Sequence, residues 1–295
     1  MSAEPTNIRA IRARRTWQEN LRRALVSAPV SAKLGMAIIF IYAIAALFAP
    51  FIAPYSETDA SSKTLLPMFV PGHFLGTDQI GRDTFSRLIF GARNTIGIAL
   101  LTVGISFCIG GTLGVFAAIM RGWFDLILSR FVDAIMSIPT LIFTLMLLSV
   151  FGKATSTLIL ILAVLDSTRV FRLARNTAMG VVSMDYVEAA RLRGEGLNWI
   201  MLKEILPNIL PPLVSEFGLR FCFVFLTIAA LSFLGVGIQP PYADWGSMVA
   251  ENRQLINFGY STPLIPAAAI ALLTVAVNFV VDWQLQRTSG LRDGQ

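Results

Sequence analysis

The stretch Asn94–Met120 reads NTIGIALLTVGISFCIGGTLGVFAAIM and contains no charged residue. A helix of about 20 predominantly apolar residues crosses the hydrocarbon core of a bilayer. This stretch is therefore long enough to span a membrane, and it decides the class of fold. Its small residues Gly110, Gly111 and Gly114 permit another helix to approach closely.

Other uncharged stretches of similar length follow the same pattern: Leu34–Ala53, Ala134–Gly152, Phe221–Ala243 and Gln254–Val281. A shorter apolar run, Ala154–Leu165, is interrupted by Asp166. Prolines lie in or near several of these stretches, at positions 139, 211, 212, 263 and 266, and each is expected to kink or start a helix.

The composition of the whole chain agrees with lipid as the surrounding solvent. Hydrophobic residues make up 55% of the 295 residues, charged residues make up 14%, and the mean hydropathy is +0.67. Soluble domains carry about 25% charged residues. These values exclude a typical soluble enzyme, a disordered protein and a disulfide scaffold. The net charge of +6 admits nucleic-acid binding or an uneven placement of basic residues around membrane spans.

The placement of Lys and Arg sets the predicted topology. Six spans with a cytoplasmic amino terminus place 17 basic residues inside and 6 outside, whereas five spans give 10 inside and 13 outside. Basic residues prefer the cytoplasmic side. The sequence therefore predicts an all-α integral membrane protein with six transmembrane helices and both termini in the cytoplasm. The fourth span then extends to about residues 170–173.

The predicted organisation follows from these spans. It comprises a cytoplasmic basic arm at 1–33, a first transmembrane helix at 34–53, a periplasmic segment at 54–93, a transmembrane core at 94–284 and a cytoplasmic tail at 285–295. The arm is too long for a cleaved signal peptide. Its basic, amphipathic part, Ile8–Val26, is expected to lie on the anionic inner leaflet.

Charged residues near the predicted spans allow more than one interpretation. Arg169, Arg172 and Arg175 have the spacing of a voltage sensor, but they begin where the predicted span ends, which favours a helix end reaching the interface. Two pairs at helical spacing are expected to neutralise each other: Asp166 with Arg169, and Glu216 with Arg220. The charges are thus expected near the ends of the spans.

Residues for catalysis or metal binding are scarce. Cys108 and Cys222 lie in apolar runs without metal-ligand spacing, and His73 is the only histidine, so no metal site is expected. No G-x-S-x-G sequence accompanies His73 to support hydrolytic catalysis. None of the four lysines lies in a phosphate-binding loop of the type G-x-x-x-x-G-K-[ST]. The chain alone is therefore not expected to bind ATP or to act as an enzyme.

The cytoplasmic loop at about 176–208 carries a helix–turn–helix pattern. A first helix is predicted over Tyr186–Arg193, with Asp185 as its cap and Gly194 as a stop that takes a positive φ. A second amphipathic piece, Leu197–Ile205, is expected to end at Pro207. The adjacent small residues at 189 and 190 permit another surface to approach the first helix.

Glu188-Ala189-Ala190, followed by Gly194 and then by Leu206-Pro207, resembles the EAA motif of bacterial ABC importer permeases. Glu204 stands where that family usually has an aliphatic residue. The resemblance implies a short coupling helix that docks into a groove of an ATPase subunit. The residues it implicates are Tyr186, Glu188, Ala189, Ala190, Gly194, Leu206 and Pro207.

Two external segments are similar to dipeptide and oligopeptide permeases of the C-subunit type. The segment from Gly76 to Arg87 reads GTDQIGRDTFSR, and Leu231–Met248 contains LSFLG, QPP and WGSM. The matching positions are Gly76, Thr77, Asp78, Gly81, Arg82, Asp83, Arg87, Pro240, Pro241, Trp245 and Gly246. Their residue types suggest a turn and cap at 77–78, an ion pair between positions 83 and 87, and a tryptophan at the outer membrane interface.

The resemblance implies the type I ABC importer permease fold and a location in the bacterial inner (plasma) membrane. It also implies partners: a homologous second permease, two ABC ATPases that bind ATP and Mg, and a periplasmic binding protein that delivers dipeptides, oligopeptides or similar small solutes. Neither a cofactor in this chain nor a nucleic-acid partner is implied. The sequence identifies no substrate-binding residue.

Alternatives stay open at this point. The same mechanism serves nickel, glutathione and opine-like solutes in similar permeases. A stand-alone secondary transporter or channel is a different class, and it is expected to show internal repeats and ionisable residues at mid-span. We find no repeat in the sequence. A membrane enzyme lacks a plausible catalytic set.

Overall fold

A computed structural model describes residues 26–60 and 62–288, and within these ranges the chain is helical without a β-strand. The elements are α2 (Val30–Leu47), α3 (Ala49–Ile52), α4 (Thr84–Met120), α5 (Gly122–Met136), α6 (Thr140–Phe151), α7 (Thr155–Val182), α8 (Asp185–Leu192), α9 (Leu197–Trp199), the π-helix η1 (Ile200–Ile205), α10 (Leu206–Phe233), α11 (Trp245–Asn252), the 3₁₀-helix η2 (Arg253–Phe258) and α12 (Leu264–Thr288). Most of the predicted amphipathic arm and the end of the predicted tail lie outside the described residues.

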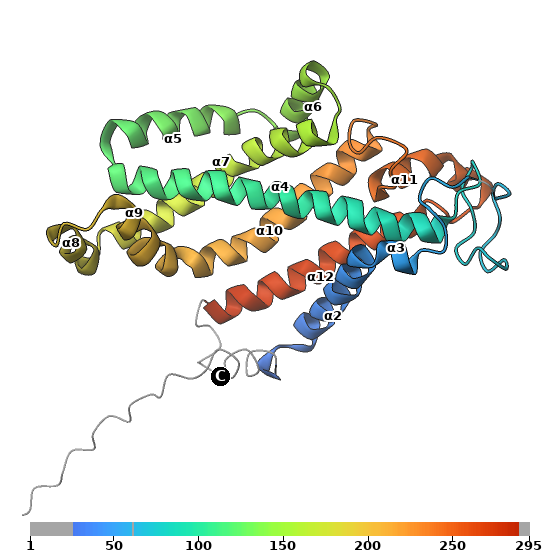
Figure 1. The fold of residues 1–295 in the computed structure, drawn as a ribbon, viewed down its shortest axis with the longest axis horizontal. Helices are drawn as coiled ribbons and strands as arrows, with labels where there is room; N and C mark the ends of the chain where they lie inside the picture. Colours follow the sequence, from blue (N-terminus) through green and yellow to red (C-terminus); the bar gives the residue numbers. More distant parts are fainter. Residues whose placement is uncertain (1–25, 61, 289–295) are drawn as a thin grey trace, which may run out of the picture.

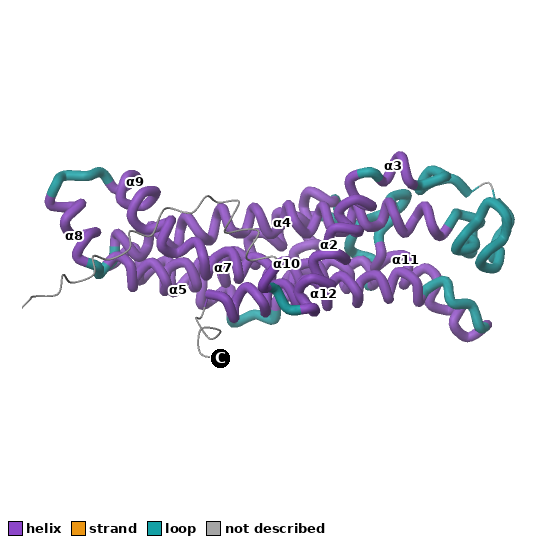
Figure 2. Tube along the Cα trace, turned by 90° about the horizontal axis from the view of Figure 1, so that it is seen from below, coloured by secondary structure: helices purple, strands orange, loops and turns teal. Residues whose placement is uncertain are grey.

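The helices form an elongated bundle with different structures at its two ends (Figure 1). The long helices α4, α7 and α10 run along the bundle, with α2 and α12 packed together on one side. Helices α8 and α9 form a tip at one end, and the long loop before α4 lies with α11 at the other. The edge-on view in Figure 2 shows that the loops gather mainly at these ends.

Four helical stretches have the length and apolar composition to cross a membrane: Val30–Leu47, Thr84–Met120, Leu197–Phe233 and Leu264–Arg287. A fifth span results if α5 and α6, which meet at a 90° bend, are counted as one. Pro139 stands immediately before α6, so the predicted third span is broken where proline removes a backbone donor.

Several predicted span limits differ from the helices. Helix α4 begins ten residues before the uncharged stretch, because the Asp83 side chain accepts a hydrogen bond from the Ser86 amide and caps the helix at Thr84. Helix α7 continues past the predicted end of the fourth span, to Val182.

The predicted fifth and sixth spans are displaced along the chain. Helix α10 ends at Phe233, where Gly235 adopts a φ of +79° and the Val236 amide bonds back to Leu231. Residues 234–243, which the prediction placed within the fifth span, form a loop, and α12 does not begin until Leu264. The prediction therefore assigned uncharged loop residues to a membrane span.

Helices α4 and α7 make the most extensive contact between helices among the described residues. A Cβ atom at Gly110 would lie 2.3 Å from the Ser167 carbonyl oxygen, and one at Gly114 would lie 2.6 Å from that of Phe171. The expected role of these glycines in close helix contact is therefore confirmed, whereas Gly111 has open space beside it.

Candidate functional site

Helix α8 lies at the tip of the bundle and ends as the sequence predicted. Gly194 has a φ of +81°, its amide donates to Arg191, and the Glu195 amide donates to Ala190. These two bonds form a Schellman motif, which satisfies carbonyl groups left free at the end of a helix. Its start differs, because Met184 occupies the cap position and the expected Asp185 cap is wrong.

The two faces of α8 have different surroundings. Val187 and Ala190 are fully buried and pack in one cluster with Ile200 and Ile205 of η1. Ala189 is exposed on the other face. The expectation that both alanines face another protein is therefore wrong for Ala190, which packs inside its own chain.

The exposed face of α8 is partly apolar. Leu192 is 84% exposed and Tyr186 is 42% exposed, with Glu188 also on the surface. Such a face, on a helix whose opposite side is already packed, suits docking into a groove of another protein.

The second arm of the loop does not end at Pro207. Helix α9, η1 and α10 are consecutive, and Pro207 occupies the first turn of α10, where its missing amide proton is tolerated. Leu206 is half-buried and Pro207 is exposed. This arm thus connects the tip directly to a long membrane helix.

At the other end, the segment from Gly76 to Arg87 folds into what we call the external clip, after the side of the membrane that the sequence predicts for it. The clip comprises Gly76, Thr77, Asp78, Gly81, Arg82, Asp83 and Arg87 together with Glu251 of α11. Asp78 Oδ1 accepts hydrogen bonds from the amides of Ile80 at 3.0 Å and Arg82 at 2.9 Å. Thr77 Oγ1 accepts a bond from the Leu66 amide at 2.9 Å. The predicted turn is therefore present, beginning at Asp78, but the expected helix cap at 77–78 is wrong, because Asp83 caps α4.

Ion pairs connect the clip to α11. Asp78 Oδ2 lies 2.6 Å from Arg82 Nε and 3.3 Å from Arg87 Nη1, and both arginines also pair with Glu251. Arg87 is almost fully buried. No sequence pattern indicated Glu251, which lies more than 160 positions further along the chain than either arginine.

The expected ion pair between Asp83 and Arg87 is wrong. Asp83 Oδ2 accepts bonds from the Ser86 amide and hydroxyl, both at 2.8 Å, and Asp83 Oδ1 lies 2.8 Å from His73 Nδ1. The carboxylate is therefore occupied by the helix cap, and Arg87 turns to Asp78 instead.

His73 is held on several sides. Its Nε2 lies 2.9 Å from Ser62 Oγ, and its ring stacks on Tyr55 with a centroid distance of 5.0 Å. Because Asp83 also caps α4, this arrangement ties the external loop to the helix. In the described ranges, no group of three His, Cys, Asp or Glu side chains has the geometry to hold a metal.

Trp245 is buried, so the expected place at the membrane interface is wrong. It is 1% exposed, its Nε1 donates to the Leu88 carbonyl oxygen at 2.9 Å, and its ring meets Tyr42 and Phe225 edge-on. Gly246 is required beside it, since a Cβ there would lie 2.3 Å from the Ala229 carbonyl oxygen. Trp245 thus connects α2, α4 and α10 through α11.

Asp244 caps α11 from a fully buried position. It accepts bonds from the Ser247 amide at 2.9 Å and from Thr95 Oγ1 at 2.8 Å. Burial raises the pKa of the Asp244 carboxyl, against the opposing effect of these hydrogen bonds. Pro240 and Pro241, joined by a cis peptide bond, are exposed at the same end.

A group of charges lies within the bundle, which the sequence did not predict. The expected pairs are present: Asp166 Oδ1 is 3.7 Å from Arg169 Nη1, and Glu216 Oε1 is 2.8 Å from Arg220 Nε. Arg220 Nη1 also lies 3.7 Å from Asp166 Oδ1, which joins α7 to α10. These residues lie near the middle of their helices, so the expected place near the ends of the spans is wrong.

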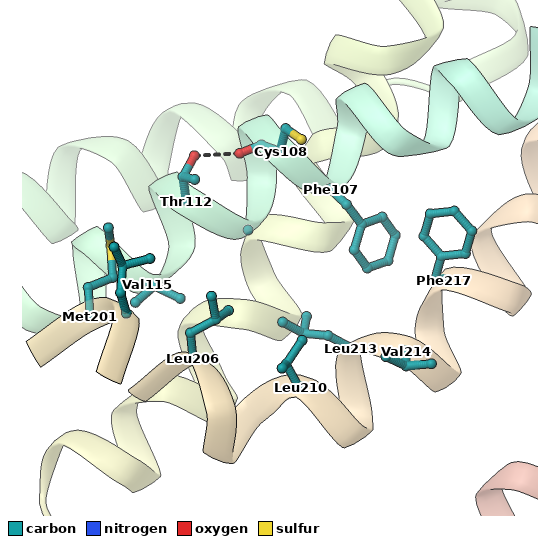
Figure 3. Close-up of a pocket in the computed structure, with 12 residues that line it drawn as sticks. Phe107, Cys108, Thr112, Val115, Met201, Leu206, Leu210, Leu213, Val214 and Phe217 are labelled. Atoms are coloured by element: carbon teal, nitrogen blue, oxygen red, sulfur yellow. Dashed lines mark hydrogen bonds between the residues drawn. The ribbon is translucent and has the colours of Figure 1, made fainter. Parts of the chain in front are cut away.

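An apolar groove of about 440 Å³ lies between α4 and the η1–α10 arm (Figure 3). Phe107 and Phe217 meet across it with ring centroids 5.1 Å apart. The Thr112 hydroxyl is bonded to the Cys108 carbonyl oxygen of its own helix. The groove thus offers packing surface and little polar recognition.

Known proteins match this chain over most of its length. A family model described as "Binding-protein-dependent transport system inner membrane component" matches residues 110–289, and a model described as "N-terminal TM domain of oligopeptide transport permease C" matches residues 29–67.

Individual relatives agree with these models. The di/tripeptide transport system permease protein DppC of Pseudomonas aeruginosa is 34% identical over 88% of this chain and 85% of its own length. The glutathione transport system permease protein GsiD of Pectobacterium atrosepticum is 31% identical over 97% and 92%. The probable D,D-dipeptide transport system permease protein DdpC of Escherichia coli is 34% identical over 87% and 84%.

The two family models together cover the first apolar helix and the core that carries α8. The relatives align with this chain over most of its length and most of their own. Relatives of this kind are transport subunits and not enzymes. The apolar helices of the structure agree with a multi-pass location in the bacterial inner membrane. The chain therefore belongs to the family of binding-protein-dependent transport system inner membrane components, the permease subunits of ABC importers.

Proposed function

We propose that this permease forms half of a translocation path for dipeptides, oligopeptides or similar small solutes, which a periplasmic binding protein delivers. The names of the relatives support peptides, and one relative supports glutathione, itself a peptide-like solute. Nickel or opine-like solutes carried by the same mechanism remain the alternative.

The proposed topology has six spans and the type I importer fold. The spans are α2 with α3, α4, α5 with α6, α7, α10 and α12. At about 1.5 Å per residue, the 28 residues of α7 reach about 42 Å, which exceeds the hydrocarbon thickness of about 30 Å. The tip with α8 is then cytoplasmic, the external clip is periplasmic, and both termini are cytoplasmic, with the arm at 1–33 and the tail at 285–295.

The exposed face of α8 is the proposed ATPase-coupling surface, within a loop at about 176–208. The single observation that carries this assignment is the difference between the faces of α8: Ala190 is buried in its own chain, while Ala189, Tyr186 and Leu192 remain available. Gly194 fixes where the helix stops, and Leu206 and Pro207 connect the surface to α10.

The proposed partners follow from the family. They are a homologous second permease, two ATPases that bind ATP and Mg, and a periplasmic binding protein. This chain itself is proposed to need no cofactor. The external clip is proposed to hold the periplasmic end rigid below the binding protein.

The experiment compares Ala189→Trp with Ala60→Trp, a matched change at an exposed alanine of the external loop. Each variant is reconstituted with all partners in proteoliposomes, and peptide uptake and peptide-stimulated ATPase activity are measured. A bulky residue in a docked face costs about 1–3 kcal/mol, so Ala189→Trp is expected to lower both activities about tenfold while Ala60→Trp keeps them. Normal coupled uptake by Ala189→Trp with the ATPases bound would contradict the assignment.

A further inference from the structure

The four charged residues inside the bundle lie at mid-depth: Asp166 and Arg169 on α7, and Glu216 and Arg220 on α10. We call them the mid-depth cluster. At about 1.5 Å per residue, Arg220 lies about 20 Å from either end of α10, and Asp166 lies about 16 Å and 24 Å from the ends of α7. With the bilayer centred on α7 and α10, all four residues fall within its hydrocarbon core of about 30 Å, where lipid would offer no polar partner.

The cluster does not satisfy its own charges fully. Asp166 is 4% exposed, and its Oδ2 has no hydrogen-bond partner among the described residues. Its other oxygen lies 3.7 Å from each arginine, which is too long for a hydrogen bond. A group of residues that served only to lock α7 to α10 would be expected to form short, complete pairs.

The cluster also reaches the surface of the chain. The Arg169 side chain is 38% exposed and the Glu216 side chain is 22% exposed. Arg169 Nη2 donates to Thr140 Oγ1 at 2.9 Å, so its guanidinium group is held beside the first residue of α6. Because exposed charge at this depth is costly in lipid, this face requires water or protein beside it, as a translocation path provides.

The chemistry of the cluster fits one class of solute. It offers two carboxylates and two guanidinium groups with no net charge, so it presents acceptors for an ammonium group and donors for a carboxylate. A peptide with free termini carries both groups. The apolar groove between α4 and α10 has no comparable polar lining.

We propose that the mid-depth cluster lines the translocation path and binds zwitterionic solutes transiently, with Arg169 and Arg220 donating to the carboxylate and with Asp166 and Glu216 accepting from the ammonium group. The inference rests on the proposed function as an importer permease. It adds a solute-contacting site, which neither the sequence nor the relatives identify.

Arg169→Gln tests the site at its most exposed member, where folding is least at risk. Arg172→Gln is the matched control, because Arg172 lies one turn further along α7, outside the cluster, and its Nη1 donates to the Met136 sulfur at 3.7 Å. The complete transporter is reconstituted, and the maximal transport rate of alanyl-alanine is compared with that of alanyl-alanine amide at saturating concentrations of each loaded binding protein. Saturation removes differences in affinity for the binding protein.

Arg169→Gln removes a charge-assisted contact to the carboxylate, so the maximal transport rate of the free dipeptide is expected to fall about tenfold. The maximal rate for the amide is expected to stay within about twofold of the wild-type value. Arg169→Lys, which keeps the charge, is expected to restore most of the rate for the free dipeptide, and this comparison does not depend on the amide. Arg172→Gln is expected to behave like the wild type.

Equal slowing of both peptides by Arg169→Gln, or no slowing of either, would overturn the proposal. Failure of Arg169→Lys to restore transport in an assembled complex would also overturn it. If the wild-type complex itself shows no peptide-stimulated ATPase activity or uptake, the proposed function fails instead, so the two failures are distinguishable.

Discussion

The external clip and helix α8 are both short, charged segments with family motifs, but their side chains have different surroundings. In the clip, Asp78 and Arg87 are buried and Arg82 is half-buried, and both arginines join α11 through Glu251. On α8, one face packs on η1, while the other remains exposed. A motif that is already satisfied within its own chain indicates a structural role, whereas a motif left exposed indicates a partner.

Removal of Arg87 is the change expected to break the clip most severely. Arg87→Gln leaves the buried Asp78 and the half-buried Glu251 with Arg82 as their remaining cationic partner, and breaking a buried pair costs at most about 3–5 kcal/mol. The unfolding midpoint of the purified protein in detergent should fall sharply. Arg93→Gln, an exposed site on the same helix, is the control and should leave the midpoint unchanged. Equal midpoints for both variants would remove the distinction between the clip and α8.

Ala189 and Ala190 allow an exposed and a buried position to be compared within one helix. Ala190→Trp overpacks the cluster with Ile200 and Ile205 and should lower the free energy of unfolding by about 1–3 kcal/mol. Ala189→Trp, on the exposed face, should leave stability unchanged and reduce only coupled transport. Thermal unfolding of both variants checks the first statement, and a destabilised Ala189→Trp would show that this face is not free.

A substitution in the turn after α8 is expected to have a smaller effect on stability. Gly194 has a φ of +81° and open space where a Cβ would lie, so Gly194→Val introduces backbone strain without a clash. Such strain costs about 1–2 kcal/mol. Gly196→Val is the matched control, because Gly196 has a φ of −70° and similar open space. Proteolysis of the tip should become faster only in Gly194→Val, and equal rates would contradict a requirement for glycine there.

The smallest expected effect concerns the pH dependence of the external end. Burial raises the pKa of Asp244 in the folded protein. As pH rises from the ordinary carboxyl pKa of about 3.9 through the raised value, the unfolded state releases its proton first, so the stability contributed by Asp244 falls. The unfolding midpoint of the wild type should therefore decrease relative to that of Asp244→Asn over this range. A constant difference between the two midpoints would contradict the raised pKa.

The sequence predicted the helical class, the break at Pro139, the turn at Gly194 and the two local ion pairs, because each depends on residues close together in the chain. It misplaced the last two spans, since loop residues 234–243 carry no charge yet lie outside α10. It also missed Glu251 and the contact between Asp166 and Arg220, which depend on how distant helices pack.

The burial of Ala190 and Trp245 also depends on how distant helices pack, so the sequence did not predict it. Small or aromatic residues suit both a partner surface and a core, so the residue types alone did not distinguish the two locations. Only the packing of η1 against α8, and of α11 against α2, α4 and α10, separates them.

Photo-crosslinking from two tyrosine positions shows directly which end of the bundle contacts the ATPase. Tyr186 lies on the proposed coupling face and Tyr242 on the external end, and both are substantially exposed. A photoreactive phenylalanine analogue is placed at each position in turn in the complete transporter. The account predicts crosslinks to the ATPase from position 186 and none from position 242. Crosslinks to the ATPase from position 242, or none from position 186 in a complex that hydrolyses ATP in response to peptide, would contradict it.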